Sequence, residues 1–233
     1  MDKKLLYEGK AKRVFQADQE DAVIMEFKDD ATAFNGQKRG QIADKGVINC
    51  ALTARLYRYL EDRRIPTHLL EALDERRLLV RRLTMIPLEV VVRNRVAGSL
   101  SQRTGLEEGT ELASCVVEFY FKNDALGDPL FNEDHIRALG LADDNTIAEL
   151  KALALRVNRV LSPFLLERQL ILVDFKLEFG RFQGRLLLGD EITPDTCRLW
   201  DASSLEKLDK DRFRRDLGDV EGAYQEVWKR VQK

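Results

Sequence analysis

The chain has 233 residues, of which 44% are hydrophobic and 33% are charged, and its formal net charge is −2. This near-neutral balance argues against a general nucleic-acid binder, which would be strongly basic, and the length suits one large domain or two small ones. The apolar runs are too short for a membrane-spanning helix, and the three widely spaced cysteines predict neither a disulfide framework nor a zinc site but a protein of the reducing cytoplasm.

The first third of the chain predicts a small α+β unit. Short strands are expected between glycine and acidic turns, at residues 5–7, 12–15, 22–27, 68–73 and 77–83. Apolar residues at helical spacing predict a long amphipathic helix over residues 45–62; they are Ile48, Leu52, Leu56 and Tyr59. Pro66 follows the end of this helix, as helix stops often do.

The turn between the first two strands reads Tyr-Glu-Gly-Lys-Ala-Lys-Arg over residues 7–13. Gly9 permits close approach of the backbone, and Lys10 and Lys12 add positive charge, so this turn is suited to lie over a phosphate chain. The spacing of a Walker A loop is absent. Taken alone, the motif is weak, and a solvated basic turn is the commoner explanation.

Residues 84–87 are predicted to cross between two lobes, because Pro87 fixes its own φ and favours an extended residue before it. The predicted lobes are residues 1–84 and 85–233. Beyond the crossing we expect strands at 89–96 and 115–122. A long helix should follow, with the apolar stripe Ile147, Leu150, Ala154, Val157 and Leu161, and Pro163 should break or kink it.

Arginines dominate one face of the strand that begins at Glu89. Alternation places Glu89, Arg93 and Arg95 on the same side, and a guanidinium can bind carboxylate or phosphate through two hydrogen bonds. Gly98 and Ser99 then open a helical stretch whose free N–H groups suit an anion. These features predict a pocket for an acidic, phosphorylated small molecule; structural ion pairs among the same residues are the alternative.

The segment 170–200 predicts a β-hairpin with one charged face. Its first strand should turn Val173, Phe175, Leu177 and Phe179 toward a core, and Asp174, Lys176 and Glu178 toward the opposite face. The loop 193–196 before Arg198 has further anion-binding potential. A polar helix near residues 209–217 and an amphipathic helix follow; the stripe of the latter is Val220, Tyr224, Val227, Trp228 and Val231.

The turn of this hairpin decides which residue faces Glu178. An odd-length loop centred on Gly184 would place Asp190 opposite Glu178, whereas a two-residue turn would place Gly189 there. Two facing carboxylates need a cation between them, and oxygen ligands suit Mg²⁺. Lys176 offers the alternative, because its ammonium can neutralise part of the charge.

Together these segments resemble one family, phosphoribosylaminoimidazole-succinocarboxamide synthase or SAICAR synthetase. The matching segments occur in the order of the family and span nearly the full chain. They are GKAKRVF (9–15), DATAFNG (30–36), VVRNRVAGSL (91–100), KNDALGDP (122–129), LVDFKLEFG (172–180), GDEITPDTCRLWD (189–201) and DKDRFR (209–214).

The resemblance implies a two-lobed α+β fold related to ATP-grasp, with antiparallel sheets, flanking helices and ATP between the lobes. It implies a ligase that joins the carboxylate of the aminoimidazole ribotide CAIR to the amino group of L-aspartate and releases ADP and phosphate. This reaction belongs to de novo purine biosynthesis. An acyl phosphate intermediate, Mg²⁺ as cofactor and a homo-oligomer, expected to be a dimer, are implied with it.

The resemblance also suggests residue roles. Contacts to ATP are implied for Gly9, Lys10, Ala11, Lys12, Met85 and Lys122. Magnesium ligands are implied at Glu178 and Asp190. Substrate binding is implied for Glu89, Arg93, Ser99, Asp128, Arg198 and Arg214. Lys176, Asp174 and Asp211 are placed around the reacting carboxylate and aspartate.

The general base stays open between Asp174, Asp211 and the substrate phosphate. Two rival functions are a small-molecule kinase of the same shape and a nucleotide sensor or RNA-binding module built around residues 93–95. The acidic hairpin argues against the last, because carboxylates repel a polyanion. The residues without the resemblance support only a magnesium–nucleotide enzyme that acts on an acidic substrate.

Overall fold

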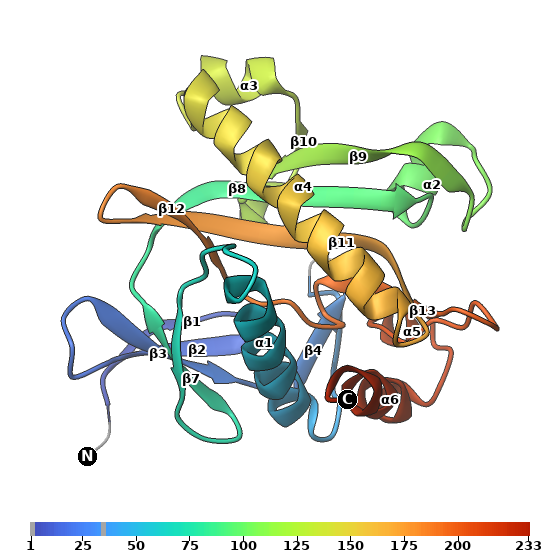
Figure 1. Ribbon diagram of the computed structural model, residues 1–233, viewed down its shortest axis with the longest axis horizontal. Coiled ribbons are helices and arrows are strands. Elements are labelled where there is room, and N and C mark those ends of the chain that lie inside the picture. Colours follow the sequence, from blue (N-terminus) through green and yellow to red (C-terminus); the bar gives the residue numbers. More distant parts are fainter. Residues whose placement is uncertain (1–2, 34–35) are drawn as a thin grey trace.

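The computed structural model describes residues 3–33 and 36–233 and has the α+β architecture expected, with antiparallel sheets and flanking helices (Figure 1). The first sheet has the order β1-β2-β3-β7-β6. Its strands are β1 (Leu5–Glu8), β2 (Lys12–Gln16), β3 (Ala22–Phe27), β6 (Leu69–Ala72) and β7 (Arg77–Arg81). The strands predicted in the first third are therefore confirmed. The short hairpin of β4 (Asp30–Ala33) and β5 (Lys38–Gln41) was not anticipated.

The second sheet has the order β10-β9-β8-β11-β12, and β13 pairs with β11 beyond this path. Its strands are β8 (Thr84–Arg95), β9 (Glu111–Phe121), β10 (Leu130–Phe131), β11 (Leu170–Phe182), β12 (Arg185–Gly189) and β13 (Cys197–Asp201). The chain passes from the first sheet to the second at residues 82–83, because residues 84–87 already belong to β8, in which Thr84 and Met85 pair with β11. The division into lobes at residue 84 stays a prediction.

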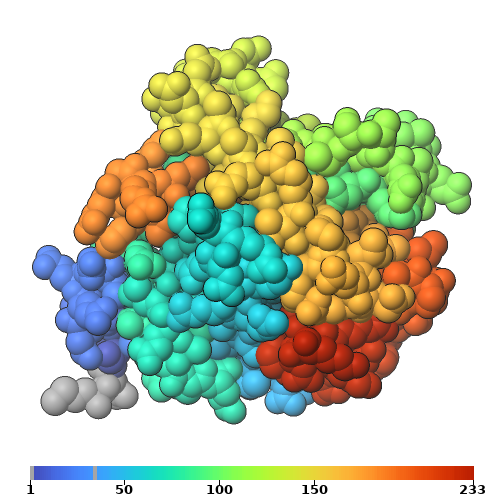
Figure 2. Space-filling model, viewed as in Figure 1, coloured from blue at the N-terminus to red at the C-terminus, as the bar shows by residue number. Residues whose placement is uncertain are grey.

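Helices cover these sheets. The predicted helix at 45–62 is confirmed as α1 (Lys45–Glu61), and the long helix is α4 (Asp144–Leu166). Figure 2 shows α1, α4 (yellow to orange) and α6 (Val220–Val231, red) side by side on one face. The short helices are α2 (Ser99–Thr104), η1 (Asp124–Leu126), α3 (Glu133–Ala138) and α5 (Asp211–Arg214). No helix in the described ranges is long and apolar enough to cross a membrane.

Two helix predictions need correction. Pro163 does not break α4, which continues to Leu166. A proline loses one backbone donor, and here burial of Phe164 and Leu165 against the core keeps the last turn in place. The polar helix expected over 209–217 shrinks to α5, because Asp216 and Gly218 adopt positive φ angles of 55° and 72°, which a right-handed helix does not allow.

The charged face of β11 is confirmed, with one exception in its apolar face. Phe175, Leu177 and Phe179 lie in the main core, which also includes residues of both sheets and of α1, α4 and α6. Val173 packs instead with Ala97 and Trp200. The cause is a register shift between Leu172 and Asp174, which turns Val173 to the other side of the strand.

The hairpin turn contains two residues, Gln183 and Gly184, whose φ angles are 50° and 78°. Positive φ at both positions is the type I′ geometry, which matches the twist of the flanking strands. Glu178 therefore pairs with Gly189, and the odd-length alternative that would put Asp190 opposite Glu178 is wrong. Asp190 instead follows the strand end, with a φ of 58°.

Candidate active site

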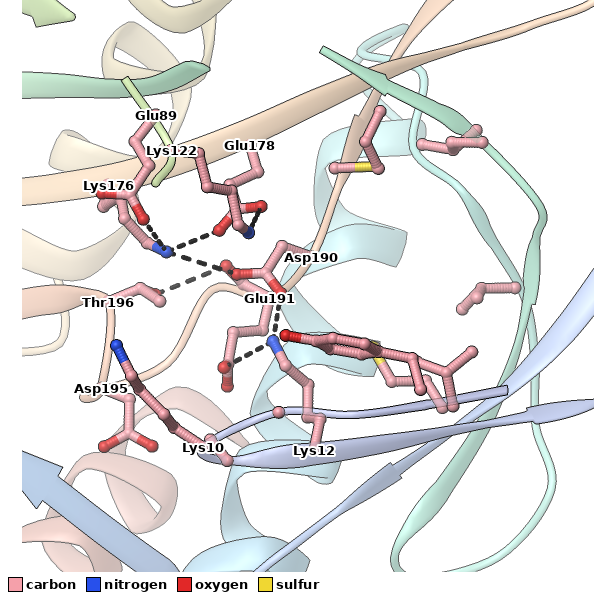
Figure 3. Close-up of a pocket in the computed structure, with 18 of the residues that line it drawn as sticks. Lys10, Lys12, Glu89, Lys122, Lys176, Glu178, Asp190, Glu191, Asp195 and Thr196 are labelled. Carbon is pink, nitrogen blue, oxygen red and sulfur yellow. Dashed lines mark hydrogen bonds and ion pairs between the residues drawn. The ribbon is translucent and has the colours of Figure 1, made fainter. Parts of the chain in front are cut away.

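A cavity of about 500 Å³ lies between the β1–β2 turn and the second sheet (Figure 3). It brings together the residues suggested to bind ATP or magnesium and several of those suggested to bind or act on the substrate. From that set it is lined by Gly9, Lys10, Ala11, Lys12, Met85, Glu89, Lys122, Asp128, Lys176, Glu178 and Asp190. Its wall near Met85 is apolar and includes Val14, Val23, Met25, Val80 and Leu83. The cavity thus joins an apolar end to an end rich in lysines and carboxylates.

Lys12 lies between two carboxylates at the charged end. Its ammonium donates to Asp190 and, at 2.7 Å, to Glu191 (Figure 3). Burial alone would lower the pKa of Lys12, but the negative charges of Asp190 and Glu191 raise it above its usual range. Burial would likewise raise the pKa of Asp190, and Lys12 together with Lys176 lowers it instead. Both groups are therefore charged at neutral pH.

Lys176 connects the carboxylates that the hairpin register separates. Its Nζ lies 2.9 Å from Glu89 Oε1, 2.7 Å from Glu178 Oε1 and 3.7 Å from Asp190 Oδ2. Burial opposes its charge, but Glu178, Asp190 and Glu89 together hold the pKa of Lys176 well above its ordinary value. Lys176 therefore neutralises part of the negative charge of these carboxylates, as the alternative to a metal ion predicted. Lys122 also binds Glu178.

The same carboxylates fit a hard divalent cation. Glu178 and Asp190 both reach one ammonium, so one cation can contact both. Mg²⁺ is commonly held by one or two carboxylates plus water and substrate phosphates. Among the described residues, no group of three or more His, Cys, Asp or Glu side chains is placed to hold a metal ion.

A second cavity of about 310 Å³ adjoins the first. It brings together the suggested substrate and catalytic residues Arg93, Ser99, Asp174, Arg198 and Arg214. Glu89, Lys176, Asp195 and Thr196 line both cavities and form what we call the shared wall. A group bound in one cavity can therefore meet a group bound in the other at Lys176.

The arginines of the second cavity also form ion pairs with carboxylates of the protein. Structural ion pairs were the alternative to an anion-binding pocket in the sequence analysis. Arg93 is 3% exposed and donates to Asp174 at 2.6 Å and to Glu118 at 2.7 Å. Its remaining terminal nitrogen donates to Ser99 Oγ, at 3.1 Å. Arg198 donates to Asp174 at 2.8 Å, and its Nη2 lies close to the backbone of Gly98. Arg198 thus keeps one terminal nitrogen that no described carboxylate binds, whereas Arg93 is held on every side.

The two carboxylates considered as general bases are both tied to arginines. Asp211 is 1% exposed, lines neither cavity, and accepts from Arg198 at 2.8 Å and from Arg214 at 2.5 Å. Burial would raise the pKa of Asp211, but these two guanidinium groups lower it to about 2. Asp174 lies between Arg93 and Arg198 in the same way. Because its pKa is lowered, Asp211 accepts protons poorly, and the role of either carboxylate as general base stays a prediction.

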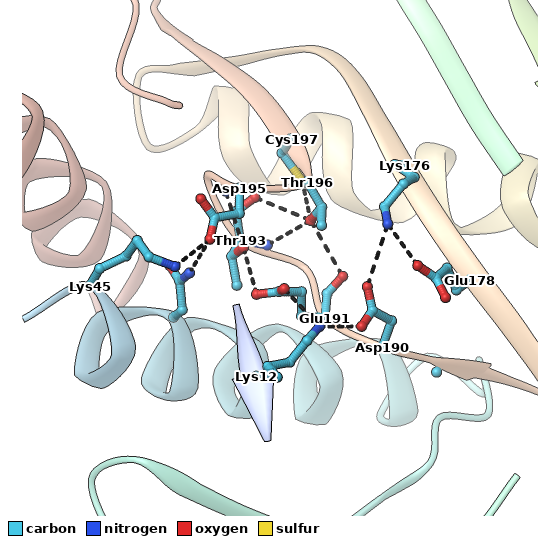
Figure 4. A network of polar contacts seen from close by, with 12 residues as sticks. Lys12, Lys45, Lys176, Glu178, Asp190, Glu191, Thr193, Asp195, Thr196 and Cys197 are labelled. Atoms are coloured by element: carbon cyan, nitrogen blue, oxygen red, sulfur yellow. Dashed lines mark hydrogen bonds and ion pairs between the residues drawn. The ribbon is translucent and has the colours of Figure 1, made fainter. Parts of the chain in front are cut away.

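Sequence reasoning missed a buried polar network behind the shared wall (Figure 4). Asp195 accepts from Lys45 at 2.6 Å, from Asn49 at 3.0 Å and from the Tyr224 hydroxyl at 2.8 Å. The loop 193–196 was noted as a candidate anion site, but Asp195 itself was given no role. Lys45 offered no signal, because a lysine at the start of a helix is usually solvated and only tertiary packing buries it.

Known proteins resemble this chain over nearly its whole length. The family described as SAICAR synthetase matches residues 5–231. A phosphoribosylaminoimidazole-succinocarboxamide synthase of Chlorobaculum tepidum is 59% identical over 227 residues, which cover 97% of each chain. The crystal structure of such a synthase from Ehrlichia chaffeensis is 43% identical, covers 98% of both chains and has a TM-score of 0.96. A SAICAR synthetase (Type-2) in complex with ADP is 49% identical, with a TM-score of 0.94, over 97% of this chain and 96% of that one.

Proposed function

This chain belongs to the SAICAR synthetase family, and we propose that its two adjoining cavities hold ATP on one side of the shared wall and CAIR on the other. The protein is an ATP-dependent ligase that condenses CAIR with L-aspartate in purine biosynthesis. One observation carries the assignment of the cavities. Lys176 stands in the wall common to both, where a phosphoryl donor and an acceptor carboxylate have to meet.

The two unlike ends of the first cavity support the proposal that it holds the nucleotide. The apolar end near Met85 suits a flat base, and the lysines of the β1–β2 turn suit phosphates. A relative that is 49% identical binds ADP. Lys10 here donates to Asp124 across the cavity, at 2.7 Å, so it is held close to the place where the phosphates would lie.

Magnesium is proposed at Glu178 and Asp190. When bound with ATP, the ion supplies charge neutralisation for phosphoryl transfer. Lys12 and Lys176 flank the same two carboxylates and hold them in place. Removal of free Mg²⁺ by a chelator should abolish turnover, and activity that persists with chelator and ATP would reject the metal site.

The proposed CAIR site is the second cavity, whose positive side chains complement an acidic ribotide. Arg198 and Arg214 line this cavity and can bind phosphate or carboxylate, and Ser99 lies beside them. Glu89 and Lys176 at the shared wall are then close to the reacting end. Burial raises the pKa of Glu89, an effect that Lys176 partly opposes, so Glu89 suits a hydrogen bond to a polar ring substituent.

The chemistry follows from the poor leaving group of a carboxylate. A carboxylate oxygen of CAIR attacks the γ-phosphorus of ATP, the bond to the β–γ bridging oxygen breaks, and an acyl phosphate and ADP result. The amino group of L-aspartate then attacks the acyl carbon and loses a proton, and phosphate leaves with the former carboxylate oxygen. Lys176 stabilises the negative charge that develops at the shared wall.

Oxygen labelling tests this sequence of bonds. With ¹⁸O in the carboxylate of CAIR, one labelled oxygen per turnover should appear in the released phosphate. ADP release should require CAIR and L-aspartate together, with SAICAR formed in step. Unlabelled phosphate would reject the acyl phosphate. ADP release with CAIR alone, without product, would instead fit the rival kinase.

We also propose a cytoplasmic location and a homo-oligomer, expected to be a dimer. Three free cysteines support the reducing compartment. Fractionation of cells tests the location, and sedimentation equilibrium of the purified protein tests the oligomer. A monomer at micromolar concentration would reject the second proposal.

A further inference from the structure

Lys210 differs from the other lysines of the first cavity. Lys10, Lys12, Lys122 and Lys176 each donate a hydrogen bond to a carboxylate. Lys210 lines the same cavity, but among the described residues its nearest carboxylate oxygen is Asp195 Oδ1, 3.6 Å away. This distance exceeds hydrogen-bond length. The ammonium of Lys210 is therefore a donor still in need of an acceptor.

Asp195 does not fill this need, because its Oδ1 lies beyond hydrogen-bond distance of the Lys210 ammonium and its charge is already paired with Lys45. Oδ2 accepts from Lys45 and Asn49, and Oδ1 accepts from the hydroxyl of Tyr224. The positive charge of Lys45 at 2.6 Å balances the carboxylate. Together, Lys45, Asp195 and Lys210 carry one net positive charge at the edge of the cavity.

The surroundings of Lys210 limit its access to water. Its side chain is 13% exposed, and burial lowers its pKa. Asp195 opposes this effect, whereas the charges of Arg214 and Lys45 add to it. Glu191 is the other carboxylate that acts on it. A partly buried ammonium without a hydrogen-bond acceptor costs free energy, which a bound anion would remove.

The position of Lys210 indicates which anion its ammonium would bind. Its neighbours Asp195 and Thr196 belong to the shared wall, where the acyl group must be attacked. Arg214 follows Lys210 by one helical turn, with a backbone hydrogen bond of 2.9 Å between them, and lines the second cavity. An ammonium and a guanidinium therefore approach the shared wall from the same short segment.

We propose that Lys210 binds a carboxylate of L-aspartate and holds its amino group toward the shared wall. The inference rests on the proposed placement of ATP and CAIR in the two cavities. L-Aspartate carries two carboxylates, and the apolar wall near Met85 and the lysines of the β1–β2 turn are already assigned to the nucleotide. Lys210 is the lysine lining the first cavity that no described carboxylate already occupies by a hydrogen bond.

The test replaces Lys210 by methionine, which keeps the length and apolar stem of the side chain and removes the charge. Lys210→Met should raise the KM for L-aspartate by about tenfold or more, the usual effect of losing a hydrogen bond to a charged group. The KM values for ATP and CAIR should stay within about twofold. Lys210→Arg should recover part of the affinity because it restores the charge.

Lys207→Met provides the matched control. Lys207 is three residues away, lies over the Trp200 ring at 4.8 Å and 3.3 Å from Glu108, and lines neither cavity. Its replacement should leave all three KM values unchanged. Succinate gives a second readout, because wild-type protein should bind this dicarboxylate more tightly than propionate, and Lys210→Met should lose that preference.

The melting temperature of Lys210→Met distinguishes a ligand-binding role of Lys210 from a structural role. Removal of an ammonium without an acceptor should leave the Tm of Lys210→Met unchanged or raised. A lower Tm with uniformly lost kcat would mean that Lys210 serves as a counter-charge for Asp195 and would overturn the proposal. A raised KM for ATP alone would assign Lys210 to the γ-phosphate instead. If wild-type protein did not require L-aspartate for ADP release, the proposed function itself would fail.

Discussion

The hydroxyl of Tyr57, on α1, donates a buried hydrogen bond of 2.5 Å to the carbonyl of Gly189, the residue before Asp190. Asp190 adopts a positive φ of 58°, which is costly for a residue with a side chain. The neighbouring backbone is held as well, since His68 N–H donates to the carbonyl of Leu188 at 2.9 Å. Tyr57 is therefore a positioning residue for Asp190, although it lies on a different element from the carboxylates.

Tyr57→Phe should weaken the binding of Mg-ADP about fivefold to tenfold, because loss of one hydrogen bond in a buried site releases the strained backbone of Asp190. Isothermal titration calorimetry measures the dissociation constant of Mg-ADP for both proteins. The KM for CAIR should not change, and Tyr59→Phe is the control, since Tyr59 lies on the same helix and its hydroxyl makes no hydrogen bond to a described residue.

A double variant shows whether Tyr57 acts through Asp190. Asp190→Asn should itself weaken binding of Mg-ADP, and Tyr57→Phe should add nothing in that background. Additive losses would mean that Tyr57 affects binding by another path. Unchanged binding by Asp190→Asn at limiting magnesium would reject Asp190 as a ligand.

Replacing Lys176 by alanine should reduce kcat by about two orders of magnitude or more, as expected when a group that stabilises developing charge is lost. Glu178 and Asp190 keep Lys122 and Lys12 as partners, but Glu89 loses its lysine. Circular dichroism should show an intact fold. A kcat within a few-fold of wild type would reject the assigned role.

Gly98→Ala should weaken binding of CAIR. A Cβ at Gly98 would collide with Nη2 of Arg198, so the guanidinium must move. We expect a raised KM for CAIR with an unchanged KM for ATP. Gly105→Ala tests a positive φ without a clash, because Gly105 lies at the other end of α2 in the left-handed region and has nothing within 4 Å of the new Cβ. Equal effects of both variants on the KM for CAIR would contradict a role of the contact with Arg198.

Asp211→Asn should change the acid stability of the protein. Arg198 and Arg214 lower the pKa of Asp211 to about 2, against the effect of burial, and its value in an unfolded chain is about 3.9. A carboxyl with a depressed pKa stabilises the fold above its unfolded pKa, and this stability is lost as the pH falls through the folded value. The Tm of the variant should lie below that of wild type at pH 7, and the gap should narrow between pH 5 and 2.

Asp18→Asn gives the comparison, because the side chain of Asp18 is 94% exposed. Its Tm should follow that of wild type over the same pH range. A constant gap between wild type and Asp211→Asn from pH 7 to 2 would contradict the pairing with the two arginines.

Much of the charged face of the site was predictable from local patterns. The alternation in 174–178 placed Lys176 and Glu178 on one side of a strand, because side chains of a strand alternate faces whatever surrounds them. The glycine and lysines of the β1–β2 turn were recognisable for the same local reason. The family was evident from several motifs in a fixed order, although the roles of single residues stay proposals.

Other features depend on contacts between distant segments, which a local pattern does not contain. The turn type set the partner of Glu178, and a hydrogen bond from α1 supports the φ of Asp190. Lys45 is buried only because Asp195, 150 residues further along the chain, meets it inside the fold. Burial and charge pairing are properties of packed neighbours, so the sequence determined which chemical groups are present. The tertiary structure decided which of them are paired and which, like Lys210, have no carboxylate within hydrogen-bond distance among the described residues.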